Sequence, residues 1–307
     1  RCKKAKNMSM TMLQIIQAAT GEMGLPVPNY VAGNQATDVV QQLALLNSAG
    51  RELTREYQWQ ALNKAHIFTV EFANITGDTI EGDSWIYNAS SALGIDDTYQ
   101  LSGLGINQAC YVSGNPVGND IPLTQPATST NVGATYTFTK VKYSMPSDYD
   151  RTIDNTHWDK SKHWLMMGPE TAQQWEWLIS GYIATGPRIR YRIFGGYFQI
   201  WPNLGSNDTL GFEYVSNGWA ESASGTPKTS FTLDTDTCIF PDALMILALK
   251  RKYFQVKGFD NIYEADYQAQ YSIAKSNDSG SATLNLAPKP ISVLIGWENI
   301  PDSNYGI

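Results

Sequence analysis

The fold is decided by the stretch Tyr143–Trp219, which reads YSMPSDYDRTIDNTHWDKSKHWLMMGPETAQQWEWLISGYIATGPRIRYRIFGGYFQIWPNLGSNDTLGFEYVSNGW. It holds six of the nine tryptophans of the chain: Trp158, Trp164, Trp175, Trp177, Trp201 and Trp219. Large aromatic side chains bury the most area per residue and dominate protein cores and interfaces. The concentration of tryptophan therefore predicts either a ligand site or the core and contact surface of the molecule.

The composition narrows the class of protein. The chain has 307 residues, a formal net charge of −7, 42% hydrophobic residues and only 17% charged residues, whereas soluble domains carry about 25% charged residues. A weakly charged polar surface suits a protein that is largely covered by neighbours. The negative net charge argues against a protein that binds nucleic acid on its own. It is compatible with a protein that surrounds DNA without binding it tightly.

Cysteine usage and hydropathy exclude several other classes. Cys2, Cys110 and Cys238 are few and widely spaced, so we expect neither a disulfide framework nor a zinc site. No apolar run approaches the ~20 residues that span a bilayer. The basic start, RCKKAKNMSM, has no apolar segment behind it, so we do not expect a signal peptide; whether residues 1–7 are native stays open.

Helical periodicity appears near both ends of the chain. The patterns predict helices over Thr11–Gly24 and from Thr37 or Asp38 to Leu62, and these are expected to form an antiparallel pair. Near the other end, PDALMILALKRKYFQVKG and NIYEADYQAQYSIAKS predict two more helices. We expect the helices of the two ends to pack together.

The middle of the chain has β patterns. HIFTVEF alternates like a strand, and about seventy turn-rich residues follow it, which predicts a small all-β unit inserted between two strands. After a short helix in PETAQQWEWLISG, a hairpin is expected with strands Arg188–Phe194 and Tyr197–Trp201 around Gly195-Gly196. The segment TLGFEYVS is expected to complete a three-stranded meander.

These elements predict an α+β fold. A helical hub, made of the N-terminal helix pair and the C-terminal helix pair, would carry a central β meander and an inserted small all-β domain. The expected units are N-terminal hub helices over 1–66, an inserted β domain over 67–142, a Trp-rich β/α core segment over 143–233, C-terminal hub helices over 234–278 and an extended tail over 279–307.

No catalytic or cofactor motif stands out. His157 and His163, with Asp154 or Asp159, form the one histidine-rich candidate, but their spacing of six suits neither one helix face nor an HExxH site. Phosphate-binding, nucleotide-binding and calcium-loop motifs are missing from the sequence. We therefore expect no enzyme activity, no catalytic residue, no metal and no cofactor, with packing or surface roles for the two histidines.

Two features are candidates for interaction. Arg188, Arg190 and Arg192 alternate along the sequence and would share one face of a strand. This face could be exposed to solvent with its charge offset by nearby acidic residues, could contact carboxylates of a neighbouring subunit, or could form part of a ring of positive charge around DNA. The tryptophans suit either a carbohydrate platform or a core and subunit interface, and we favour the second.

The central stretch resembles the head–tail adaptor (connector) family of tailed bacteriophages. The resemblance rests on PSDYDR, HWDKSKHW, GPETAQQWEWL and GPRIRYRI, and on the flanking helices LLNSAGRELTREYQWQAL and FPDALMILALKRKYFQVKGFD. It covers roughly Thr11–Leu62 and Tyr143–Ser276. Lys160 stands where arginine is common, and the chain departs from the family pattern at about residues 73–140, where shorter members have only a turn.

The resemblance implies a location, partners and site residues. It implies a homo-oligomeric ring of twelve subunits in the neck of the virion, assembled in the host bacterial cytoplasm, which joins the portal protein to the tail nozzle or tail tube, lies close to the phage DNA in the channel and touches no membrane. We expect the subunit interface or the lumen to use Trp158, Trp164, Trp175, Trp177, Arg188, Arg190 and Arg192. We expect the portal or tail contact to use Ile291, Val293, Leu294, Ile295 and Trp297. A carbohydrate-binding tail or fibre protein, and a hydrolase using His157, are the alternatives.

Overall fold

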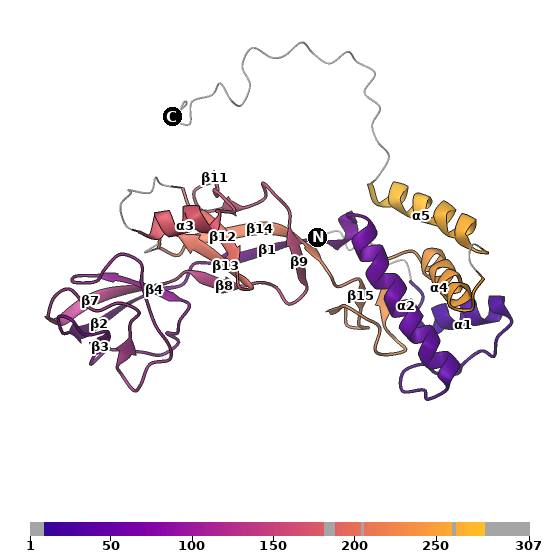
Figure 1. Cartoon of the computed structure of the whole chain (residues 1–307), viewed down its shortest axis with the longest axis horizontal. Coiled ribbons are helices and arrows are strands. Elements are labelled where there is room, and N and C mark those ends of the chain that lie inside the picture. The colour runs from indigo at the N-terminus through magenta and orange to yellow at the C-terminus, as the bar shows by residue number, and fades with distance from the viewer. Residues whose placement is uncertain (1–8, 181–187, 204–205, 260–261, 280–307) are drawn as a thin grey trace, which may run out of the picture.

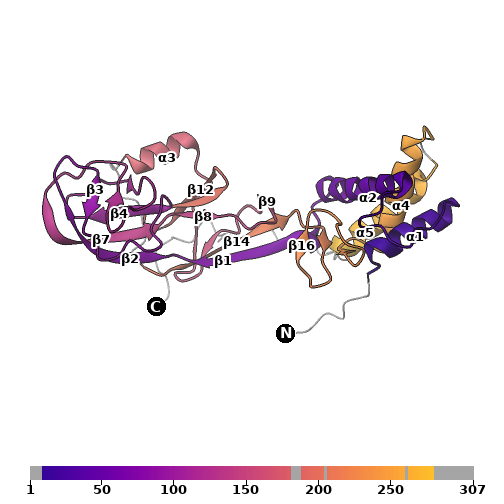
Figure 2. The same cartoon turned by 90° about the horizontal axis from the view of Figure 1, so that it is seen from below.

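The computed structural model describes residues 9–180, 188–203, 206–259 and 262–279. These residues form an elongated molecule with helices at one end, a β-sheet module at the other and further sheets between them (Figures 1 and 2). The strands β1 and β14 run along the middle of the molecule and connect its two ends (Figure 2).

Four helices make up one end: α1 (Met12–Met23), α2 (Thr37–Glu56), α4 (Asp242–Val256) and α5 (Glu264–Ser279). α1 begins with the reciprocal hydrogen bonds of a capping box between Thr11 and Gln14 and ends at Gly24 in the left-handed conformation, with φ of 69°. Helix α4 packs against α1, α2 and α5. The expected α1–α2 pair is therefore wrong, because α4 provides the main packing surface of both helices.

The predicted α+β fold built on a helical hub is also wrong. The structure is mostly antiparallel β: the described residues contain strands β1 to β17 in four sheets, against five α-helices. The four helices α1, α2, α4 and α5 occupy one end rather than the centre, and α3 lies apart from them among the sheets (Figure 1). Many strands have only two to five residues, too few for period-2 alternation to be recognised in the sequence.

A five-stranded sheet forms the middle of the molecule. It has the order β1-β14-β10-β11, and β9 also pairs with β14. The longest ladder joins β1 (Asn63–Thr69) to β14 (Thr209–Ser216), from Asn63↔Val215 to Thr69↔Thr209. The shorter strands are β9 (Tyr149–Thr152), β10 (Trp158–Asp159) and β11 (Trp164–Leu165).

The predicted hairpin is confirmed, but the predicted meander is wrong. Strands β12 (Arg190–Phe194) and β13 (Tyr197–Trp201) pair around Gly195 and Gly196, both at positive φ, as a primed turn requires. The third strand of this sheet is β8 (Lys142–Ser144), which pairs with β13. β14 belongs to the five-stranded sheet instead, and the two sheets share an aromatic core that includes Phe198 and Phe212.

Residues 72–140 build a six-stranded sheet with a core of its own. Its strands are β2 (Phe72–Thr79), β3 (Trp85–Tyr87), β4 (Tyr99–Gly103), β5 (Cys110–Tyr111), β6 (Ile121–Pro122) and β7 (Asn131–Lys140), in the order β5-β4-β7-β2-β3-β6. The core of this sheet includes Ile86, Tyr136 and Phe138. The segment HIFTVEF is divided between two sheets, because β1 ends at Thr69 and β2 begins at Phe72.

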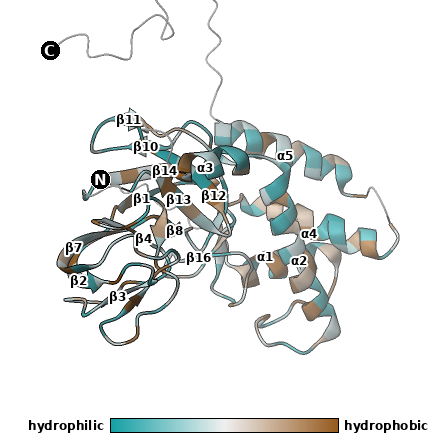
Figure 3. Ribbon diagram, turned by 60° about the vertical axis from the view of Figure 1, so that its left-hand side comes forward, coloured by the Kyte–Doolittle hydropathy of each residue, from teal (hydrophilic) through white to brown (hydrophobic). Residues whose placement is uncertain are grey.

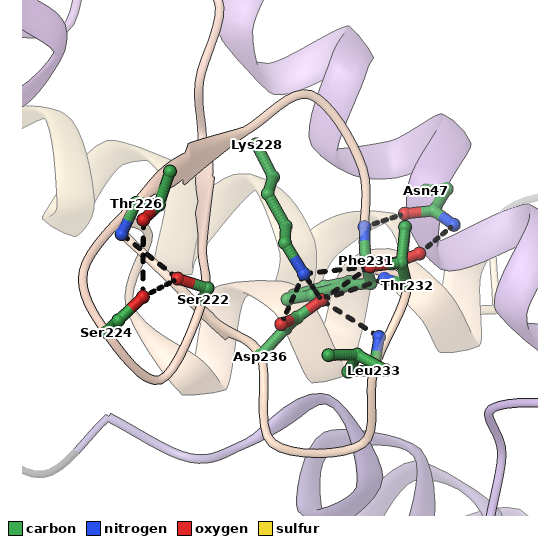
Figure 4. Close-up of polar contacts among 9 residues, drawn as sticks. All are labelled: Asn47, Ser222, Ser224, Thr226, Lys228, Phe231, Thr232, Leu233 and Asp236. Atoms are coloured by element: carbon green, nitrogen blue, oxygen red, sulfur yellow. Dashed lines mark hydrogen bonds and ion pairs between the residues drawn. The ribbon is translucent and has the colours of Figure 1, made fainter.

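A small sheet joins the five-stranded sheet to the helices. It consists of β15 (Ala220–Glu221), β16 (Pro227–Lys228) and β17 (Thr237–Cys238). The loop before β17 is organised by the buried carboxylate of Asp236, which accepts hydrogen bonds from Lys228 Nζ at 2.8 and 2.9 Å and from two backbone amides (Figure 4). Asn47 of α2 binds the backbone of Phe231 in the same loop (Figure 4).

Two short elements complete the described chain, the 3-10 turn η1 (Gln60–Leu62) before β1 and the helix α3 (Ala172–Ile179). Hydrophobic colour is concentrated in the central strands, whereas α5 is largely hydrophilic along its length (Figure 3). Among the described residues, no helix has both the length and the apolar character needed to cross a membrane. The division of the chain into the five expected units stays a prediction.

Candidate functional site

The four tryptophans predicted as interface residues lie in different environments. Trp158 on β10 and Trp164 on β11 are 40% and 39% exposed, and Trp177 on α3 is 53% exposed. Trp175 is 3% exposed and packs with Ala109 and Trp201 in a small core between α3 and neighbouring sheets. Three of the four are therefore available to a partner, whereas Trp175 holds the subunit itself together.

Trp158 belongs to an exposed row across the five-stranded sheet. Ile67 on β1 is opposite Gly211 on β14, which is opposite Trp158 on β10. Residues opposite one another on adjacent strands point to the same face, and Ile67 is 56% exposed. Because Gly211 has no side chain, a hollow of about 190 Å³ opens in this row, and Lys160 lies across it.

The arginines are engaged inside the subunit. Arg190 Nη1 binds Glu170 Oε1 at 2.6 Å, and Arg192 Nε donates to Gln199 Oε1 at 3.0 Å. The Arg192 guanidinium also lies over the rings of Trp175 and Phe194, at 4.7 and 4.5 Å from their centroids. Arg188 lies just before β12 and is half-buried. Repulsion along this strand is thus offset locally by a carboxylate and by aromatic faces.

A groove of about 260 Å³ lies where α3, the β12–β13 hairpin and the six-stranded sheet meet. Aromatic rings of Tyr111, Trp175 and Phe194 line it, together with the cations Lys142 and Arg192. Lys142 Nζ is 5.8 Å from the Tyr111 ring centroid, and burial raises the pKa of Tyr111 to about 12. The groove has the chemistry to hold a flat apolar group that carries a negative charge.

Asp148 of the PSDYDR motif, in the turn before β9, binds residues of the two strands β1 and β14. Its carboxylate accepts hydrogen bonds from Lys64 Nζ (2.6 Å), Tyr214 Oη (2.8 Å) and Ser216 Oγ (2.7 Å). Burial alone would raise the pKa of Asp148, but the hydrogen bonds from these donors outweigh it and hold the pKa below its usual value. The motif therefore has a structural role, because it fixes the turn before β9 onto β1 and β14.

His157 is a packing residue. It is 1% exposed and stacks on Tyr191 with ring centroids 4.1 Å apart, and its Nδ1 is 3.0 Å from Tyr191 Oη. Burial lowers the pKa of His157 to about 4, so the ring is neutral at neutral pH. A substrate would have to open this aromatic core to reach the imidazole, and the hydrolase alternative gains no support from this position.

The other members of the histidine candidate also have local roles. Asp159 Oδ1 accepts hydrogen bonds from the backbone N–H groups of Ser161 and Lys162 at 3.0 and 3.1 Å, and these bonds shape the β10–β11 turn. His163 lies in that turn, exposed and with a positive φ of 58°. Within the described ranges, no group of three or more His, Cys, Asp or Glu side chains is arranged to hold a metal ion.

Sequence reasoning missed two important positions, Lys64 and Tyr111. Lys64 meets Asp148 only because β1 pairs with β14, and no local pattern links residues 84 positions apart. Tyr111 lies in the six-stranded sheet and reaches the groove beside Trp175. The predicted contact residues Ile291, Val293, Leu294, Ile295 and Trp297 lie outside the described residues.

No protein-family model matches this chain, and no curated protein matches it either.

Proposed function

We propose that the chain is a structural subunit of a virion, in the ring-shaped head-to-tail adaptor that joins the portal to the tail of a tailed bacteriophage. The proposal rests on the sequence resemblance of PSDYDR, HWDKSKHW, GPETAQQWEWL and GPRIRYRI to that family. In this role the subunits form a ring, contact the portal and the tail nozzle or tail tube, and surround the DNA channel. The role is structural and needs no cofactor.

The structural observation that supports the proposal is the exposure of three tryptophans on β10, β11 and α3. Trp158, Trp164 and Trp177 are 39–53% exposed on three elements of the resembling stretch. Tryptophan is the residue type most enriched among the energetic anchors of protein interfaces. Trp158 and Trp164 lie on opposite faces of the sheet, because Trp158 is opposite Leu165 and Trp164 is opposite Asp159. Each half-exposed indole therefore fits burial in a separate contact with a neighbouring subunit.

The test is the mass of the purified full-length protein, measured by light scattering with and without the portal protein. We expect ring-sized assembly on the portal, and we expect Trp164→Ala to weaken assembly by at least tenfold in midpoint concentration. Leu93→Ala is the matched control, because Leu93 is 94% exposed but lies in the six-stranded module. A protein that stays monomeric with the portal contradicts the proposal.

A second candidate, carbohydrate binding in a tail or fibre protein, is favoured by one observation. Trp158 and Trp164 present half-exposed indoles on adjacent short strands, on opposite faces of the sheet, and each indole offers one aromatic ring on which a sugar can stack. Binding of glycans by the isolated monomeric chain, abolished by Trp158→Ala, supports this candidate over the adaptor.

A further inference from the structure

The outer edge of β1 is an open sheet edge. Among the described residues β1 pairs only with β14, so one side of the strand has no neighbouring strand. The other side of β14 is occupied: Thr209 O accepts from Lys160 N at 2.8 Å, and Glu213 O accepts from Ile153 N at 3.0 Å. The backbone of Thr209, Gly211 and Glu213 therefore faces away from β1.

The backbone groups of successive residues in an antiparallel strand point alternately to its two sides, and this shows which residues of β1 face β14 and which face outward. The even-numbered residues of β14 face β1, and their partners are Lys64, His66 and Phe68. The intervening residues Ala65, Ile67 and Thr69 consequently direct their backbone N–H and C=O groups outward. These outward groups have no hydrogen-bond partner among the described residues.

This edge lacks the features that usually protect edge strands, which are proline, bulges and free charges. The seven residues read NKAHIFT, and the ladder to β14 runs without a register shift. The one lysine, Lys64, is bound to Asp148 at 2.6 Å. Ile67 is 56% exposed beside the hollow at Gly211. Such an edge is a template for an added strand.

The C-terminal tail leaves the described structure next to this edge. Helix α5 ends at Ser279, and the Asp278 carboxylate accepts the backbone N–H groups of Gln60 and Ala61 at 2.6 and 3.1 Å. Those residues belong to η1, the turn that leads directly into β1. The end of α5, where the described chain stops at Ser279, therefore lies close to the turn that leads into β1.

The tail contains a segment with the composition of a strand. Ile291–Trp297 reads ISVLIGW, has seven residues and no charge, and places Ile291, Val293, Ile295 and Trp297 on one face if extended. Residues 280–290 span up to about 36–40 Å, which exceeds the roughly 23 Å length of β1. The segment can therefore reach every register of the edge within its own chain, where the short linker gives a high effective concentration.

We propose that Ile291–Trp297 of the same chain docks as an added strand on the outer edge of β1. The docked segment satisfies the backbone groups of Ala65, Ile67 and Thr69 and covers the exposed side chain of Ile67. The inference does not depend on the proposed adaptor role, because it concerns the isolated subunit.

The test is residue-resolved amide hydrogen exchange on the full-length protein, which compares the outward amides of Ala65, Ile67 and Thr69 with the inward amides of His66 and Phe68. We expect both sets to be protected. The double variant Val293→Asp/Ile295→Asp should accelerate exchange of the outward amides at least tenfold and leave the inward amides within twofold. Thr283→Asp/Asn285→Asp adds the same charge to the tail outside the segment, and should change neither set.

A second variant tests the same contact from the other side. The N–H of Ile67 is outside the β1–β14 ladder, so Ile67→Pro blocks strand addition while the ladder hydrogen bonds remain. We expect it to accelerate amide exchange in alternate residues of Ile291–Trp297, with His66 and Phe68 still protected as proof that the sheet is folded. Outward amides that exchange freely in the unmodified chain overturn the proposal. Protection that grows with protein concentration, together with a dimer mass, overturns it too, because the strand then comes from a second copy.

Discussion

The indole of Trp219 lies directly against Gly50 of α2, so a Cβ atom at residue 50 would overlap with the six-membered ring. Trp219 is fully buried, its Nε1 donates to Thr229 O at 3.0 Å, and its ring meets Phe231 edge-on with centroids 4.9 Å apart. The close approach of helix and indole therefore fixes the position of α2 against the loop that follows the five-stranded sheet.

Gly50→Ala should destabilise the protein even though alanine is the better helix former. The helix-propensity gain is about 1 kcal/mol, whereas overpacking a buried contact of this kind costs typically 1–3 kcal/mol. The indole cannot move without losing its hydrogen bond to Thr229. We expect a lower urea midpoint, monitored by tryptophan fluorescence.

Gly21→Ala in α1 is the matched control for this prediction. A Cβ at residue 21 meets nothing within 4 Å, so only the helix-propensity gain of roughly 0.5–1 kcal/mol remains. We expect the two Gly→Ala changes to shift the midpoint in opposite directions. A stabilised Gly50→Ala variant would show that α2 is free to move away from Trp219.

Asp148→Ala should destabilise the protein by roughly 1–3 kcal/mol, since it leaves two buried hydroxyl groups without their hydrogen-bond acceptor. Tyr214 Oη and Ser216 Oγ lose their acceptor, and Lys64 Nζ loses its counter-ion. The measurement is the free energy of unfolding in urea at neutral pH.

Asp150→Ala, two residues away in the same motif, separates this network from a general effect of lost charge. Asp150 forms an ion pair with the neighbouring Arg151 at the surface, with 38% of its side chain exposed. Exposed pairs contribute about 0–1 kcal/mol, so this variant should stay close to the parent. Equal losses for the two aspartates would refute a special role for Asp148.

Local patterns in the sequence predicted the elements that are stabilised by their own residues. The stop of the first helix at Gly24 and the turn at Gly195-Gly196 both depend on residues within one or two turns of chain. These features lie where they were expected. The pattern of PDALMILALKRKYFQVKG likewise predicted a helix, and the structure has it as α4 over Asp242–Val256.

The predictions that were wrong concern contacts between residues that are far apart in the sequence. The pairing of Asn63 with Val215 has no local signature. The packing of the helices of the two ends was expected, and α4 does pack against α1 and α2. The segment TLGFEYVS has the right pattern for a strand but two possible neighbours, the hairpin before it and β1 far away in the chain. The sequence analysis therefore paired this strand with the hairpin instead of with β1, and the predicted architecture at the centre of the fold was wrong for the same reason. For the candidate site, the sequence named the tryptophans but did not separate the buried Trp175 from the exposed Trp158, Trp164 and Trp177.

The stability of the protein should depend on pH through His157. Burial lowers the pKa of His157 to about 4 in the folded chain, against about 6.5 for an unperturbed histidine in the unfolded chain. Between these pH values the unfolded state binds more protons than the folded state, so the free energy of unfolding falls as pH is lowered from about 6.5 to about 4. The loss attributable to His157 is at most about 3 kcal/mol.

In His157→Phe, which keeps an aromatic ring between Tyr191 and Phe212, this part of the pH dependence should disappear. Urea unfolding of both proteins at pH 7, 6, 5 and 4 gives the comparison, and the variant should lose less stability over this range. Other titrating groups, His66 included, are common to both proteins and cancel in the difference. Parallel curves would mean that His157 is protonated in the folded state, and that the aromatic stack opens more readily than its burial implies.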